Sequence, residues 1–166
     1  MKERILGIDP GFGRIGYGVI EEQNNRWVHV THGCIETSAK KTFTERLLEL
    51  REALQKIIIE YKPSRAAVEE LFFYNNAKTA INVGQARGVI LLTFIDAKLP
   101  IDEFTPLEVK QAIAGHGRAE KTEVQRMVSL QLQLKELKMQ DDAYDALAIA
   151  LTSAATLGMK RRLGQA

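Results

Sequence analysis

Four acidic side chains stand where a folded chain has little structural use for a charge. Asp9 follows an aliphatic run and precedes a Pro-Gly turn, and Glu69 ends a second short apolar run. Asp142 and Asp145 are three residues apart in a helical pattern, so they share one helix face. An Asp before Pro-Gly can also cap the turn, which leaves Asp9 alone open to both interpretations. Because an unpaired charge out of water is costly, the four together indicate a function.

The four carboxylates together indicate a site that binds hard divalent cations. Like charges gathered at one place repel each other, and ligands that are all oxygen suit Mg²⁺ or Mn²⁺. Two such ions can hold the attacking and leaving oxygens of an in-line phosphoryl transfer. The sequence contains no Walker loop, no Ser/His/Asp set and no cluster of zinc ligands. We interpret the scattered His29, His32 and His116 as surface or structural residues.

Short strands must carry the first two acids to one place. We expect strands over 5–9, 16–20 and 27–36, the first two forming an antiparallel hairpin. A capping box followed by helical spacing predicts a helix over 43–61, which Lys62-Pro63 stops. Residues 65–69 then return to the sheet as in a crossover connection. Glu69 therefore ends its strand at the same edge as Asp9, where open sheets bind ligands.

The second half of the chain must supply the other two acids. The predicted elements are a helix over 76–98, a strand over 101–104, short helices over about 106–114 and 120–134, and a last helix from residue 140. Gly84 and Gly88 leave a flat face on the first of these helices, which indicates close packing on the sheet or on another helix. The alanine-rich last helix suits close packing on the sheet, which turns Asp142 and Asp145 toward the acidic edge.

Length and composition bound the class of protein. The 166 residues fit one domain with a real core, and the composition is ordinary for a globular protein. A net charge of +2 means that any nucleic-acid affinity must come from a local patch. Cys34 is the single cysteine, so we expect no internal disulfide and a cytoplasmic location. We see no signal sequence and no membrane-spanning run.

Basic residues cluster in two places. Lys110, Arg118, Lys121 and Arg126 fall within one helix–loop–helix unit after the fifth strand, where either a solvated surface or phosphate binding would explain them. Residues 159–166 carry Lys-Arg-Arg, and we predict a flexible basic tail there that adds non-specific attraction to DNA.

The sequence resembles the RuvC family of Holliday junction resolvases over nearly its whole length. Each shared motif is short, but they occur in order and at fitting spacings. They are Leu6-Gly7-Ile8-Asp9-Pro10-Gly11, Gly16-Tyr17-Gly18-Val19-Ile20, Gly33-Cys34-Ile35, Val68-Glu69, Gly84-Gln85-Ala86-Arg87-Gly88, Val109-Lys110-Gln111, Ala119-Glu120-Lys121 and the run from Asp142 to Ala150. The resemblance implies an α/β, ribonuclease H-like nuclease domain over 1–158, with a five-stranded mixed sheet flanked by helices.

The resemblance also implies an activity and its residues. It implies a homodimer that binds a four-way DNA junction and makes two symmetric nicks with Mg²⁺, with Mn²⁺ as a substitute and two ions per site. A branch-migration motor of the RuvA and RuvB type is the implied partner in recombination and repair. The implied catalytic and metal-binding residues are Asp9, Glu69, Asp142 and Asp145. The implied DNA contacts are Lys110, Arg118, Lys121 and a base-stacking Phe72.

Two choices between neighbouring residues remain, and three rival functions have to be weighed. We place the ligand at Asp142, not Asp141, because it keeps the i, i+3 relation to Asp145; Phe73 is the alternative to Phe72. An actin-like ATPase shares the opening strand, acid and glycine turn, but 166 residues leave no room for its second lobe. Another ribonuclease H-like nuclease, acting on RNA or a hybrid, is the closest rival enzyme. A non-catalytic junction-binding module would not need four intact acids.

Overall fold

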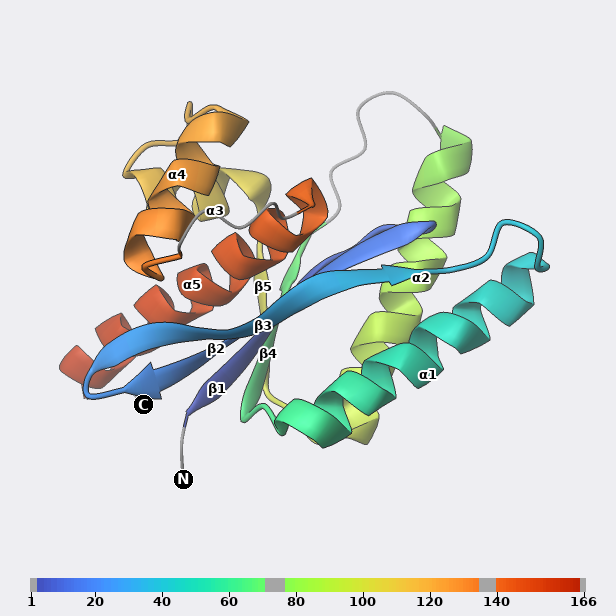
Figure 1. Ribbon diagram of the computed structural model, residues 1–166, viewed down its shortest axis with the longest axis horizontal. Helices are drawn as coiled ribbons and strands as arrows, with labels where there is room; N and C mark the ends of the chain where they lie inside the picture. Colours follow the sequence, from blue (N-terminus) through green and yellow to red (C-terminus); the bar gives the residue numbers. More distant parts are fainter. Residues whose placement is uncertain (1–2, 71–76, 135–139, 165–166) are drawn as a thin grey trace.

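The computed structural model describes residues 3–70, 77–134 and 140–164, and a single five-stranded sheet runs through it (Figure 1). The strands are β1 (Arg4–Asp9), β2 (Arg14–Gln23), β3 (Arg26–Glu36), β4 (Arg65–Glu69) and β5 (Ile101–Phe104). Their order is β3-β2-β1-β4-β5, with β1 antiparallel to β2 and parallel to β4. The predicted five-stranded mixed sheet and its opening hairpin are confirmed.

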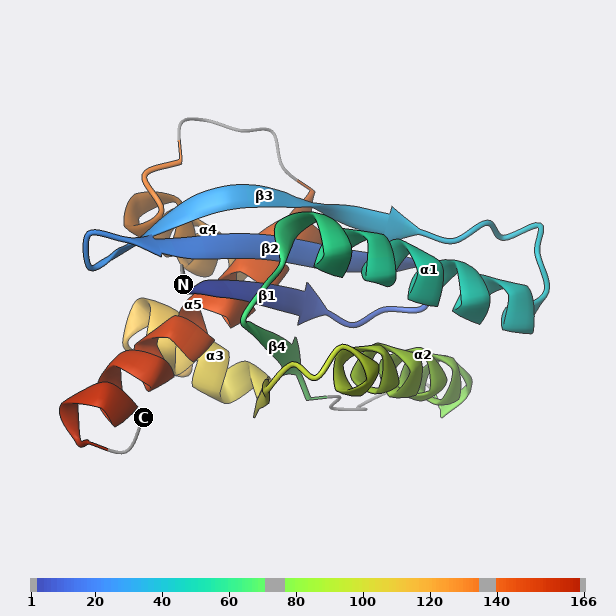
Figure 2. The same ribbon diagram turned by 90° about the horizontal axis from the view of Figure 1, so that it is seen from below.

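The helices form a layer on each face of the sheet (Figures 1 and 2). They are α1 (Phe43–Tyr61), α2 (Ala77–Asp96), α3 (Pro106–Ala114), α4 (Lys121–Gln131) and α5 (Asp141–Arg162). Helices α1 and α2 cover one face, and α3, α4 and α5 cover the other. None of the helices in the described ranges is both long and apolar enough to cross a bilayer.

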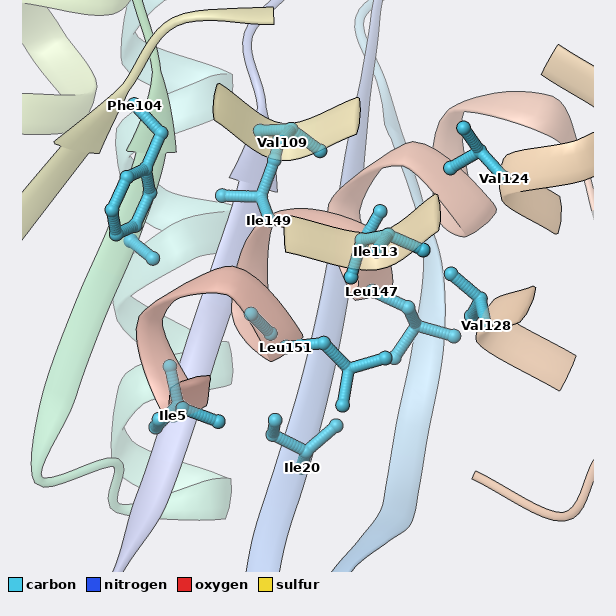
Figure 3. Close-up of a cluster of buried hydrophobic side chains, with 14 of the residues drawn as sticks. Ile5, Ile20, Phe104, Val109, Ile113, Val124, Val128, Leu147, Ile149 and Leu151 are labelled. Carbon is cyan, nitrogen blue, oxygen red and sulfur yellow. The ribbon is translucent and has the colours of Figure 1, made fainter. Parts of the chain in front are cut away.

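Helix α5 joins the sheet to the α3–α4 layer. Leu147 and Leu151 of α5 belong to one buried cluster with Ile20 of the sheet and Ile113 of α3 (Figure 3). Glycines let this helix approach the strands closely, since a Cβ at Gly16 would collide with the backbone of Asp142. The start of α5 is therefore held against β2, next to the end of β1.

Local sequence signals set several helix ends. The capping box predicted before α1 is confirmed at Thr42, and a second one stands at Thr105 before α3. Helix α4 ends at Gln131, earlier than predicted, because the chain turns at Gln133 with a positive φ of 51°.

The flexible tail predicted from residue 159 does not begin there. Helix α5 continues through Lys160 to Arg162. Arg161 donates from Nη1 to Glu22 at 2.8 Å and from Nη2 to Glu3 at 3.0 Å. These contacts tie the last turn to the sheet, and its positive charges complement the helix dipole.

Candidate active site and nucleic-acid interface

Asp9 and Glu69 end neighbouring parallel strands. Strand β1 pairs with β4 so that Ile8 lies opposite Val68, and the two acids occupy the next positions. Parallel strands bring their carboxyl ends to one edge, so the crossover predicted from the sequence places both carboxylates together. The backbone of the apolar strands fixes these positions, independent of any side-chain contact.

Burial and mutual repulsion disfavour the charged forms of these acids. Burial, followed by the charges of Asp145, Glu69 and Asp142, raises the pKa of Asp9 to about 8, while Lys121 opposes the rise. Burial, followed by the charge of Asp145, raises the pKa of Glu69 to about 7. Asp9 therefore lies within electrostatic reach of the other three predicted acids, and Glu69 lies within reach of Asp145.

The acids of α5 differ from the strand acids because each forms an ion pair with a basic side chain. Lys121 Nζ lies 3.0 Å from Asp145 Oδ2, and Arg14 Nη1 lies 3.3 Å from Asp142 Oδ2. Burial raises the pKa of Asp145, and the Lys121 ammonium opposes that rise. Within the described residues, neither Asp9 nor Glu69 forms an ion pair. The strand acids thus carry the least compensated charge.

Asp141 and Asp142 differ in exposure and in the acids on which they act: both add to the effect of burial in raising the pKa of Asp145, Asp141 the more strongly. Asp141 is 66% exposed, and its carboxylate accepts from Gln125 Nε2 at 3.1 Å and lies 3.4 Å from Lys121 Nζ. Asp142 is 30% exposed, and its charge is among those that raise the pKa of Asp9. Asp142 is therefore the better placed of the two to share a ligand with Asp9.

A depression of about 270 Å³ adjoins two of the acids. Helices α3 and α4 bring Lys110 and Lys121 to its wall, which Glu69 and Asp145 also line. Lys110 is close enough for its charge to oppose the raised pKa of Glu69. Arg118 is exposed in the connection between α3 and α4 and does not line this depression. The predicted base-stacking Phe72 lies outside the described residues, as does Phe73.

A second depression, of about 490 Å³, lies beside Asp142. Its walls are Gly13, Arg14, Glu36, Thr37 and Asp142. Sequence reasoning did not single out Arg14, although it is the only Lys or Arg between Asp9 and residue 26. A larger groove of about 710 Å³, between the β2–β3 turn and the end of α4, is lined by none of the four acids.

The four acids fit Mg²⁺ or Mn²⁺ in donor type. Among the described residues, no three His, Cys, Asp or Glu side chains already form a ligand set. Mg²⁺ needs no such cage, since it commonly binds through one or two carboxylates, waters and substrate phosphates. A cation at the Asp9–Glu69 edge would also relieve the repulsion that raises both pKa values. The donor set is thus open, with room for a phosphate.

Known proteins match the chain over nearly its full length. The family model described as "Crossover junction endodeoxyribonuclease RuvC" matches residues 5–153. Proteins of that name from Petrotoga mobilis and Desulfitobacterium hafniense are 51% and 49% identical, covering 88% and 98% of this chain and 90% and 98% of their own.

Solved structures agree with these sequence matches. The structure described as Thermus thermophilus RuvC in complex with Holliday junction substrate is 35% identical, with a TM-score of 0.88 over 98% of this chain and 97% of its own. The yeast mitochondrial Holliday junction resolvase Ydc2, 11% identical with a TM-score of 0.74, shares the fold over 96% of this chain and 81% of its own. The chain belongs to the RuvC family of crossover junction endodeoxyribonucleases.

Proposed function

We propose that this chain is a cytoplasmic endodeoxyribonuclease that resolves four-way DNA junctions by paired symmetric nicks during recombination and repair. The observation that carries the proposal is the pair of strand acids, Asp9 and Glu69, whose pKa values are raised to about 8 and about 7 at one sheet edge. Two lysines that suit a phosphate stand beside them. Membership of the RuvC family supports the same substrate.

The reaction assigned to this site is hydrolysis of a DNA phosphodiester. Mg²⁺, when bound in one or two copies, supplies positive charge at the scissile phosphate and orients the attacking water. Asp9, Glu69, Asp142 and Asp145 are the residues proposed to hold it, with Mn²⁺ as a substitute. The chain itself keeps these carboxylates together through the β1–β4 register and the close packing of α5.

Contacts to DNA are assigned to the basic side chains around the acids. Lys110 and Lys121 line the depression, and we assign them to backbone phosphates next to the scissile bond. Arg118, exposed between α3 and α4, is assigned to a more distant phosphate. Phosphate contacts position the protein without reading sequence, which suits an enzyme that recognises the shape of a junction. Phe72 is proposed to stack on a base opened near the crossover.

Two symmetric nicks call for two copies of the active site. Helix α2 presents Ile81, Leu92 and Ile95, each more than half exposed, at spacings that place them in one stripe. Gly84 and Gly88 lie in the same stripe, where an added Cβ would meet nothing within 4 Å. The flat face indicated by these glycines therefore packs against none of the described residues. We assign it to a second copy, because a twofold interface uses one patch on both subunits.

A motor that moves the junction is the second proposed partner. Family membership points to a branch-migration complex of the RuvA and RuvB type, which would deliver successive sequences to the two sites. This assignment rests on the family alone and on no surface of the described residues.

The test is incubation of the protein with Mg²⁺ and one of three labelled substrates: a four-way junction, a linear duplex of the same sequence, and an RNA–DNA hybrid. We expect paired nicks at symmetric positions in the junction alone, with 5′-phosphate and 3′-hydroxyl ends that a ligase reseals. Cutting of the hybrid would indicate a different ribonuclease H-like nuclease. Binding of the junction without nicking would indicate a non-catalytic module.

A further inference from the structure

Arg14 lies on the side of the α5 N-terminus away from the lysines. Its Nη1 is 3.3 Å from Asp142 Oδ2, and its Nε is 3.6 Å from Glu36 Oε1. Lys121 pairs instead with Asp145. The two depressions share no lining residue, and each contains one acid of α5 and at least one cation. The acidic site is thus flanked by positive charge on two sides, from α3 and α4 and from β2.

We propose that Arg14 forms a second phosphate-binding position, on the side of the active site opposite Lys110 and Lys121. This inference rests on the proposed function, because it assigns Arg14 to the same bound DNA. Without DNA, the guanidinium pairs with Asp142 and Glu36. With DNA, it binds a backbone phosphate that flanks the scissile one, and Asp142 is released from the pair.

The geometry favours such an exchange of partners. Arg14 and Glu36 are 53% and 62% exposed, so their ion pair lies in water, where such pairs are weak. The planar guanidinium matches the oxygens of a phosphate in two parallel hydrogen bonds. The depression around Arg14 is open enough, at about 490 Å³, to admit part of a DNA backbone. A strand that crosses the acidic edge from the lysines would continue toward this depression.

Glu36 allows a test that separates phosphate binding by Arg14 from a purely structural role of Arg14. It competes with the phosphate for Arg14, and within the described residues it forms no ion pair with an assigned catalytic residue. Removing its charge should therefore leave Arg14 freer and tighten DNA binding. If Arg14 served only to hold Asp142, the loss of the Glu36 charge would act through direct repulsion of DNA alone, and would tighten binding equally with Arg14 or Gln at position 14.

The experiment measures binding of a labelled four-way junction, and of a linear duplex of the same sequence, in chelator between 50 and 200 mM salt. The proteins are wild type, R14Q, R14K, E36Q and the double variant R14Q/E36Q, in which the gain from E36Q should shrink. The control is R51Q, because Arg51 is 44% exposed and forms one ion pair, with Asp96 at 2.9 Å, on α1. We expect R14Q to reduce the slope of log affinity against log salt by about 1 per protomer, so that over that range it loses about 3-fold less affinity per protomer, or about 12-fold less for the dimer. R14K and R51Q should keep the wild-type slope, and E36Q should bind more tightly.

Two results would overturn the assignment of Arg14. One is a wild-type slope for R14Q, and the other is unchanged affinity for E36Q. A slope for R14K as low as that for R14Q would also contradict it, because the positive charge is still present. Failure of the proposed function has a different signature: the wild-type protein would then show no preference for the junction over the linear duplex in the same titrations.

Discussion

Lys121 Nζ lies 3.0 Å from Asp145 Oδ2, so an ammonium from α4 stands beside a carboxylate of α5. The same nitrogen is 3.4 Å from Asp141 Oδ2. Before DNA binds, this cation partly offsets the charge of the acidic site. Because the lysine is 49% exposed and lines the depression, a phosphate can reach it from solvent.

Lys121→Ala should therefore weaken junction binding and lower its salt dependence. Loss of one phosphate contact reduces the slope of log affinity against log salt by about 1 per protomer. Lys110→Ala should do the same, and the matched control is Lys56→Ala, an exposed lysine of α1 outside the depression. Filter-binding titrations at several salt concentrations give the slopes. Equal slopes for all three variants and wild type would mean that these lysines only solvate the surface.

Asp9→Asn should raise the melting temperature of the metal-free protein at pH 8. The folded-state pKa of Asp9 is about 8, against about 3.9 in an unfolded chain. Because the folded state holds this proton more tightly than the unfolded chain does, Asp9 contributes its full stabilisation below about pH 4. That contribution is lost as pH rises through about 8. Removing the charge should stabilise the fold at pH 8 by about 1 kcal/mol, which corresponds to about 2–4 °C.

Thermal melts in chelator and in excess Mg²⁺ or Mn²⁺ test this expectation. The gain from Asp9→Asn should shrink toward pH 5, where wild-type Asp9 is itself protonated. The further rise produced by metal should be smaller in the variant, because metal stabilises the fold by binding the assembled site. Asp145→Asn should raise the melting temperature less, since Lys121 already offsets that charge. A lower melting temperature for Asp9→Asn in chelator at pH 8 would identify Asp9 as a hydrogen-bonded structural residue.

Leu92→Glu should disrupt the homodimer. Leu92 is 54% exposed in the α2 stripe, and a charge there would be buried against the second copy. The control is Leu130→Glu, which places the same charge at a 60% exposed position on α4. Light scattering after gel filtration should show a monomer for Leu92→Glu and a dimer for Leu130→Glu. Two monomers, or two dimers, would place the subunit interface elsewhere.

Phe72→Ala should impair nicking more than binding. Stacking on an opened base holds the junction in its cleavable form, whereas binding depends mainly on phosphate contacts. Comparison of single-turnover nicking rates and binding constants for Phe72→Ala and Phe73→Ala separates the two rings. Normal nicking by Phe72→Ala together with a defect in Phe73→Ala would reassign the stacking role to Phe73.

The positions of the strand acids could be predicted because their signals are local. An apolar run ended by an acid and a turn marks Asp9, and a crossover after a capped helix carries Glu69 to the same edge. The face of α5 followed from the i, i+3 spacing of Asp142 and Asp145. Each acid's place in its own element follows from residues only a few positions apart, and the general rule for crossover connections brings Glu69 to Asp9.

Contacts that depend on distant segments could not be predicted. Arg14 meets Asp142 across 128 positions of sequence, and nothing near Arg14 encodes that contact. We interpreted His29 and His32 as scattered residues, but His29 Nε2 lies 2.8 Å from His32 Nδ1. The register of β3 against β2 shifts there and leaves Val30 without a partner. Such a bulge turns side chains that would otherwise face opposite sides of the strand toward each other.

The most direct measurement compares nicking of a four-way junction in Mg²⁺ by Asp9→Asn, Glu69→Gln, Asp142→Asn and Asp145→Asn, with Asp141→Asn as the matched control. An amide keeps the shape of the side chain and removes the charge that binds metal, so the four variants should bind the junction and fail to nick it. Asp141→Asn should nick at close to the wild-type rate. Strong nicking by any of the four, or loss of nicking in Asp141→Asn alone, would contradict a site built from these carboxylates.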